Sequence, residues 1–87
     1  MTTGWRVEVT PPARRDLRRL DAPVRQRVTA ALYRLVADPP AGDIVKLRDT
    51  DEHRLRVGDW RVRLRLDREE RAVYVLRVLP RGRAYHD

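Results

Sequence analysis

The sequence predicts an α+β fold, in which an αα-hairpin packs on one face of a mainly antiparallel sheet with the element order β-α-α-β-β-β. Three observations support this prediction. Residues 53–66, HRLRVGDWRVRLRL, alternate apolar and charged residues on both sides of a Gly-Asp dipeptide, which is typical of a β-hairpin. Residues 11–35 carry apolar residues at helical spacing. Residues 5–9 and 72–79 alternate as strands do, so residues 1–87 are expected to form a single domain.

The first strand and first helix follow each other directly. The strand is expected at residues 5–9, WRVEV. Thr10 has the side chain of an N-cap, and Pro11 is tolerated at the first helical position, where its missing N–H costs nothing. The helix is expected to end near Leu20. The residues that should form its narrow apolar stripe are Ala13, Leu17 and Leu20.

A second helix is expected to begin after Asp21, which is a good capping residue. Pro39 and Pro40 are expected to terminate it. The short connection between the two helices predicts that they run antiparallel. The apolar positions of the second helix are Val24, Val28, Ala31, Leu32 and Leu35.

An arginine-rich ribbon is the most informative stretch. Residues 43–47 should form a short extended lead-in, and Gly58-Asp59 should form the turn, because glycine adopts positive φ without steric cost. Counting outward from the turn pairs Val57 with Trp60 and assigns alternate residues to opposite faces. The apolar face is Leu55, Val57, Trp60, Val62, Leu64 and Leu66, and the opposite face is Arg54, Arg56, Arg61, Arg63 and Arg65.

The last strand is expected at residues 72–79 and ends at Pro80. Strict alternation assigns Tyr74, Leu76 and Val78 to one face, and Val73, Val75 and Arg77 to the other.

Charge and composition limit the classes of function that the chain can have. Arginines placed directly opposite each other destabilise a sheet by roughly 0.2–1 kcal/mol per pair, which favours a surface that meets a polyanion. The net charge of +7 and the pI near 11.1 point the same way. A solvated basic face and a GC-rich coding sequence are the competing explanations. With no cysteine and two histidines, no metal or other cofactor is expected, and no segment predicts a signal peptide or membrane span, so a cytoplasmic location is expected.

The ordered set of motifs resembles the toxins of the RelE/ParE superfamily of type II toxin–antitoxin systems, on the RelE side. The resemblance rests on ARRDLRRL, on a second helix followed by proline, on Lys46-Leu47, on RLRVGDWRV and on Arg81 followed four residues later by Tyr85. It covers nearly the whole chain. It implies a RelE-like fold and a ribosome-dependent mRNA endonuclease, in which the ribose 2′-oxygen attacks the adjacent phosphate. The alternative is a ParE-like toxin that inhibits DNA gyrase without cutting RNA.

The resemblance also implies site residues. Arg61 and Arg81 are expected to stabilise negative charge at phosphorus, and Tyr85 is the candidate general base. Relatives often have lysines at two ribbon positions where this chain has Arg54 and Arg56, which cannot exchange a proton. The catalytic set is therefore Arg61, Arg81, Tyr85, Arg56 and Arg54, and the expected RNA-binding residues are Lys46, Arg63, Arg65 and Arg83.

The expected partners are the ribosome, mRNA and a cognate acidic antitoxin. The antitoxin segment is expected to be disordered when free and to fold as a helix in the groove between the αα-hairpin and the sheet. The complex is expected to bind its own operator through the antitoxin, and no membrane partner is expected.

Overall fold

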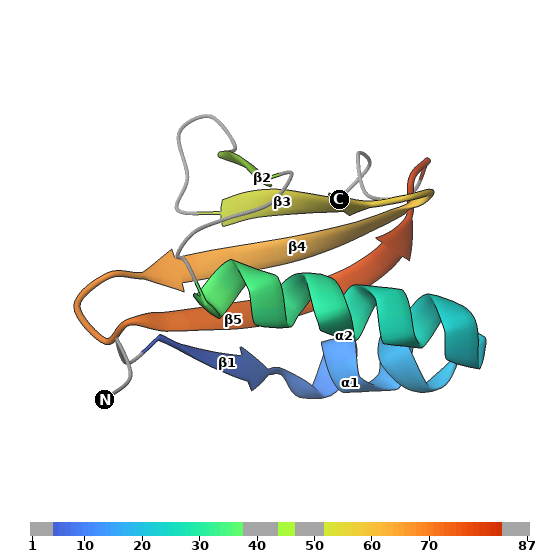
Figure 1. Cartoon of the computed structure of the whole chain (residues 1–87), viewed down its shortest axis with the longest axis horizontal. Helices are drawn as coiled ribbons and strands as arrows, with labels where there is room; N and C mark the ends of the chain where they lie inside the picture. Colours follow the sequence, from blue (N-terminus) through green and yellow to red (C-terminus); the bar gives the residue numbers. More distant parts are fainter. Residues whose placement is uncertain (1–4, 38–43, 47–51, 83–87) are drawn as a thin grey trace.

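The computed structural model describes residues 5–37, 44–46 and 52–82, and every structural statement below concerns these residues. Two helices pack on a five-stranded sheet with the strand order β1-β5-β4-β3-β2 (Figure 1). Strands β1 and β5 are parallel, and the other neighbours are antiparallel. The elements are β1 (Arg6–Val9), α1 (Pro11–Arg18), α2 (Ala22–Ala37), β2 (Ile44–Lys46), β3 (Glu52–Val57), β4 (Trp60–Asp67) and β5 (Ala72–Pro80). The predicted fold class is confirmed, and the extended lead-in is itself a paired strand, β2.

The hairpin of β3 and β4 has the register that the turn predicts. Val57 pairs with Trp60, and Arg56 pairs with Arg61. Gly58 has a φ of +57°, a left-handed value that favours glycine. Because the turn fixes the register, every apolar residue of the ribbon faces the helices and every arginine faces the other way.

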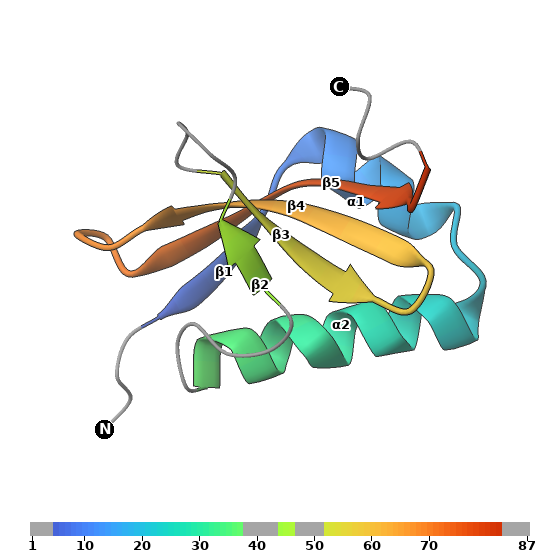
Figure 2. The ribbon, with the colours of Figure 1, turned by 90° about the horizontal axis from the view of Figure 1, so that it is seen from above.

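The core lies between the sheet and α2, which crosses one face of the sheet (Figure 2). The side chains of Val28 and Leu35 on α2 are fully buried, as are Val62 and Leu64 on β4. Ala13 of α1 is also fully buried in the same cluster, so both helices contribute to one core. Trp60 packs against this cluster at its edge, as its position on the apolar face predicts.

Strand β5 departs from simple alternation. Leu64 pairs with Val75 whereas Arg63 pairs with Arg77, so Leu76 is an extra residue, a β-bulge. A bulge reverses the alternation beyond it. Val78 therefore joins Val73 and Val75 on the core side, and the assignment of Val78 to the face of Tyr74, and of Arg77 to the face of Val75, was wrong.

Helix α1 covers the edge of β5 where β1 ends. Thr10 is the N-cap: its Oγ1 accepts the Ala13 N–H at 3.5 Å and donates to the Val75 carbonyl at 2.7 Å. Further along, the Asp16 carboxylate accepts the Val78 N–H at 2.9 Å. The next outward-facing residue of β5 is Pro80, which has no N–H to satisfy. Side chains of α1 and a proline thus satisfy an edge that a longer β1 would otherwise pair.

Candidate nucleic-acid interface

Strands β3, β4 and β5 present a face of arginines on the side of the sheet opposite the core. We call it the arginine face. Cross-strand pairing arranges it in three rows: Glu52–Arg65–Tyr74, then Arg54–Arg63–Arg77, then Arg56–Arg61–Leu79. Neighbouring strands lie about 4.8 Å apart. The middle row therefore places three arginines on adjacent strands, and sequence reasoning found only two of them.

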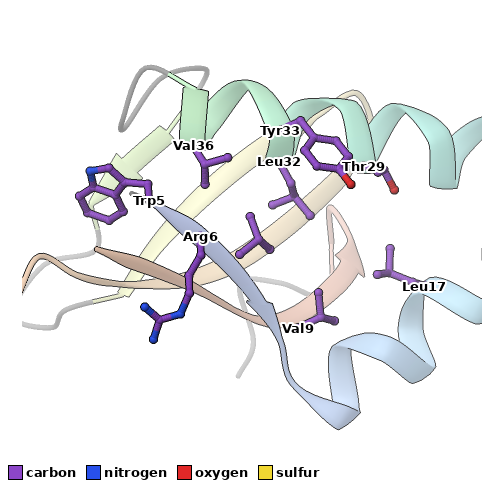
Figure 3. Close-up of a pocket in the computed structure, with 9 residues that line it drawn as sticks. Trp5, Arg6, Val9, Leu17, Thr29, Leu32, Tyr33 and Val36 are labelled. Atoms are coloured by element: carbon purple, nitrogen blue, oxygen red, sulfur yellow. The ribbon is translucent and has the colours of Figure 1, made fainter. Parts of the chain in front are cut away.

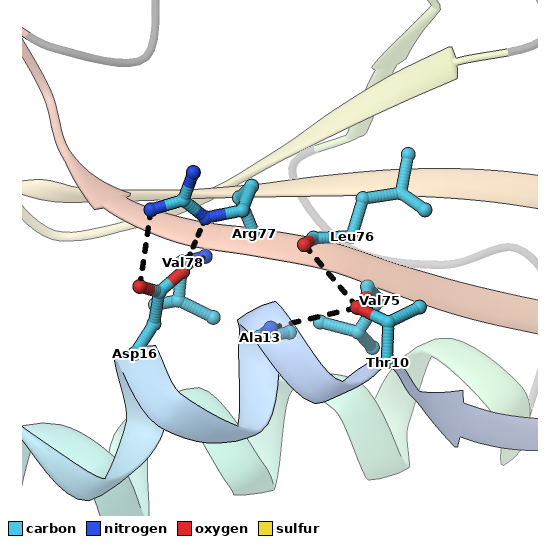
Figure 4. A network of polar contacts seen from close by, with 7 residues as sticks. All are labelled: Thr10, Ala13, Asp16, Val75, Leu76, Arg77 and Val78. Carbon is cyan, nitrogen blue, oxygen red and sulfur yellow. Dashed lines mark hydrogen bonds and ion pairs between the residues drawn. The ribbon is translucent and has the colours of Figure 1, made fainter.

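Arg77 is tied to helix α1. Its Nε donates to Asp16 Oδ2 at 2.8 Å, and a terminal nitrogen donates to Asp16 Oδ1 at 3.2 Å (Figure 4). Burial alone would raise the pKa of Asp16, but the hydrogen bonds from Arg77 and the Val78 amide outweigh burial and lower that pKa. Asp16 therefore stays ionised and neutralises one arginine of the middle row. The signal for Asp16 was present, because it follows Ala13 by three residues and lies on the apolar stripe of α1.

Arg63 also has a carboxylate partner. One of its terminal nitrogens lies 2.8 Å from Glu52 Oε2 and 3.0 Å from Oε1. Both side chains are about one-fifth exposed, so the pair is partly shielded from water. Glu52 and Asp16 thus offset part of the repulsion within the arginine face. The electrostatic repulsion between opposed arginines is therefore smaller than the sequence alone predicts.

The two arginines expected to stabilise charge at phosphorus both lie at the hairpin turn, but Arg61 is buried and Arg81 is exposed. Arg61 is only 7% exposed, and a terminal nitrogen donates to the carbonyls of Gly58 and Trp60, each at 2.9 Å. The Arg61 guanidinium therefore stabilises the hairpin turn. Arg81 is exposed just beyond β5, and its backbone N–H donates to the Asp59 carbonyl at 2.9 Å, which places it beside the same turn.

The remaining expected site residues are distributed as follows. Arg56 and Arg65 are exposed on the arginine face, and Arg54 is half-buried. The Arg65 guanidinium lies over the Tyr74 ring, 4.8 Å from its centroid, so an aromatic side chain joins the arginines. Lys46 is a residue of β2, but its side chain lies outside what the structure describes, as do Arg83 and Tyr85.

A separate groove lies between β1 and the two helices (Figure 3). Its volume is about 380 Å³. Tyr33 at its rim is 68% exposed and is the one large hydrophobic side chain among the described residues that is exposed. The groove is lined by Trp5, Arg6, Val7, Val9, Leu17, Thr29, Leu32, Tyr33 and Val36.

A comparison with protein families matches most of the chain to one family. Residues 7–85 match the sequence model of a family described as the ParE toxin of the type II toxin–antitoxin system parDE. A search of curated proteins found no match. No helix among residues 5–37, 44–46 and 52–82 has the length and apolar character needed to cross a membrane.

Solved structures give a second comparison. The archaeal RelE–RelB complex from Pyrococcus horikoshii matches with a TM-score of 0.81 and 26% identity, over 93% of this chain and 99% of that chain. The RelBE2 toxin–antitoxin complex of Mycobacterium tuberculosis matches with a TM-score of 0.80 and 28% identity, over 91% and 100%. The isolated RelE toxin of E. coli, at 20% identity and a TM-score of 0.76 over 87% and 83%, shares the fold.

Proposed function

This chain belongs to the ParE toxin family of type II toxin–antitoxin systems, and we propose that it is a toxin that cuts mRNA on the ribosome. The arginine face is the observation that carries the proposal. Three rows of cross-strand pairs bring together arginines and one aromatic ring, which suits the phosphates and bases of single-stranded RNA. Two of the similar structures, at 26% and 28% identity, contain RelE-type toxins, which favours RNA as the target.

Guanidinium groups can stabilise the charge that develops when RNA is cleaved by its own 2′-oxygen. Attack of the ribose 2′-oxygen on phosphorus develops negative charge on the equatorial oxygens, which preorganised cations stabilise. Arg81 and Arg56 are the exposed arginines near the hairpin turn and would contact the phosphate. Arg61 would support them by fixing the turn, because its guanidinium is buried against the Gly58 and Trp60 carbonyls. The target would place the protein in the cytoplasm.

Inhibition of DNA gyrase is the second candidate, because the matching family is the ParE toxin family. The arginine face would then bind DNA or an acidic protein surface. The order of events after induction separates the two. If translation stops before plasmid supercoiling changes, the ribosome is the target. The reverse order would favour gyrase.

Primer extension on programmed ribosomes tests the nuclease directly. Wild-type protein should produce cuts within codons. The double variant Arg56→Ala/Arg81→Ala should cut at least about 100-fold more slowly, because preorganised donors typically contribute that much. Both residues are exposed, so the fold should survive.

Arg27→Ala/Arg34→Ala is the matched control. It removes the same charge from exposed positions on α2, on the opposite side of the sheet. If both double variants cut as fast as the wild-type protein, the arginine face is not the nuclease site.

An antitoxin partner is part of the proposal. The two similar complexes each pair a toxin with its antitoxin. The groove between β1 and the helices would receive an apolar helix, with Tyr33 at its rim as an anchor. The net charge of +7 favours an acidic partner.

A further inference from the structure

Cleavage through a 2′-oxygen needs a group that removes the 2′-hydroxyl proton. Arginine does not exchange a proton near neutral pH, so the arginines at positions 54, 56, 61, 63 and 65 cannot serve. A carboxylate lies among them. Glu52 is the first residue of β3 and shares the arginine face with Arg54, two residues further along the strand.

The surroundings of Glu52 fix its position. Arg63 on β4 contacts both of its carboxylate oxygens, at 2.8 and 3.0 Å. Arg65 on β4 is the residue directly opposite it in the register. On its other side, β2 pairs Lys46 with His53, the neighbour of Glu52 in sequence, and the Lys46 side chain lies outside the described part of the structure. Among the described residues, Arg63 contacts this carboxylate and Arg65 lies opposite it in the register.

The middle arginine row lies close to Glu52 along the strands. Arg54 belongs to the middle row, Arg54–Arg63–Arg77, and is two residues from Glu52 along β3. Their Cα atoms are therefore about 7 Å apart. A phosphate held by that row would lie within reach of a glutamate side chain. The Glu52 side chain is 23% exposed, so its carboxylate is oriented by Arg63 and still open to the face.

We propose that Glu52 is the general base, which removes the 2′-hydroxyl proton of a nucleotide whose 3′-phosphate is bound between the middle arginine row and Arg56 of the next row. This inference rests on the proposed nuclease function and adds a residue to it. Positioned acid–base groups typically contribute 10²–10⁴-fold to a rate.

The step conserves atoms and charge. The 2′-hydroxyl proton moves to a Glu52 oxygen while the 2′-oxygen forms a bond to phosphorus. The bond between phosphorus and the 5′-oxygen breaks, and the 5′-oxygen takes a proton from solvent water. Glu52 then returns its proton to solvent. The net change is the transfer of one proton from the 2′-oxygen to the 5′-oxygen, with a 2′,3′-cyclic phosphate as the product.

Single-turnover cleavage of mRNA on programmed ribosomes, at saturating toxin, tests the inference. Glu52→Gln should cut at least about 100-fold more slowly. Its affinity for the programmed ribosome should be equal or higher, because the substitution removes a negative charge from a surface that binds phosphates. Glu52→Asp should recover part of the rate. A loss of structure alone would lower affinity and rate together.

The pH profile is the second readout. Carboxylic acids ordinarily titrate near pH 4 and phenols near pH 10. With a carboxylate base, Glu52→Gln should lose any rise in rate that the wild-type protein shows in the acid range. With a tyrosine base, the rate should continue to rise in the alkaline range.

Glu70→Gln is the matched control. It removes the same charge from an exposed residue that pairs with Arg6 at 3.7 Å, and it should cut like the wild-type protein. If wild-type protein cuts and Glu52→Gln cuts equally fast, the role of Glu52 is overturned while the nuclease function stands. If wild-type protein does not cut on ribosomes, both are overturned. A rate that climbs above pH 8 in both proteins also rejects Glu52 as the base.

Discussion

Removal of the Asp16 carboxylate should strongly destabilise the fold. Asp16 is 7% exposed and accepts three hydrogen bonds, two from Arg77 and one from the Val78 N–H. Asp16→Ala leaves the buried Val78 donor unsatisfied, which costs about 1–3 kcal/mol. The loss of Arg77's partner adds about 1 kcal/mol, discounted because that side chain is 39% exposed and water can replace the carboxylate. The expected total is about 2–4 kcal/mol.

Chemical denaturation at pH 7 measures this loss. In a domain of this size, such a loss lowers the melting temperature by roughly 10–30 °C. Asp16→Asn should cost less than Asp16→Ala, because the amide oxygen can still accept the Val78 N–H. The control Glu69→Gln removes a carboxylate from an exposed residue of the turn before β5 and should change stability by no more than about 0.5 kcal/mol.

The pH dependence provides the sharper test. The pKa of Asp16 is lowered in the folded protein, so ionised Asp16 stabilises the fold. That contribution is fully present above about pH 4, where the unfolded chain is also ionised, and is lost as the pH falls through the lower folded-state pKa. The difference in unfolding free energy between wild type and Asp16→Asn should therefore shrink in acid. A difference that is below about 1 kcal/mol for Asp16→Ala at pH 7, or that stays constant for Asp16→Asn down to pH 2, would refute the reasoning.

Two further predictions concern the turn and the partner. Gly58→Ala should lower the unfolding free energy by about 1–2 kcal/mol through backbone strain alone, since φ is +57° and no atom lies within 4 Å of an added Cβ. Gly58→Asn should cost less in the same denaturation experiment, and equal costs would contradict this explanation. The neighbouring open reading frame should encode an acidic protein whose on-rate, measured by stopped flow, falls steeply with salt. Tyr33→Ala should raise its off-rate whereas Arg27→Ala should not, and an on-rate that is flat with salt would count against charge steering.

The hairpin could be predicted from the sequence because its determinants are local. Gly58 and Asp59 fix the turn, and counting outward gives each cross-strand pair of β3 and β4. The N-cap Thr10 and the following prolines likewise determine the start of α1 from adjacent residues. The face of arginines follows from the same local rule.

The rest of the site depends on contacts between distant segments. The bulge at Leu76 arises where β5 pairs with β4 on one side and meets α1 on the other, and the sequence Val75-Leu76-Arg77-Val78 has apolar residues on both possible faces, so alternation does not reveal the bulge. Asp16 and Val78 are 62 residues apart in sequence, so no local pattern connects them. The burial of Arg61 has a different, local origin, because its guanidinium donates to the carbonyls of Gly58 and Trp60 in the turn, and simple alternation places the residue on the exposed face.

The two carboxylates also determine the net charge of the arginine face, which is the proposed RNA-binding surface. Glu52 neutralises Arg63, and Asp16 neutralises Arg77. Asp16→Asn should therefore change two properties in opposite directions. The variant should be less stable, and its middle row should carry one more positive charge that no carboxylate neutralises. Its RNA affinity should increase, and the slope of log affinity against log salt should steepen by about 0.7 for a single strand. Asp16 belongs to α1 and Arg77 to β5. A single ion pair therefore couples the packing of α1 on the sheet edge to the charge of the arginine face.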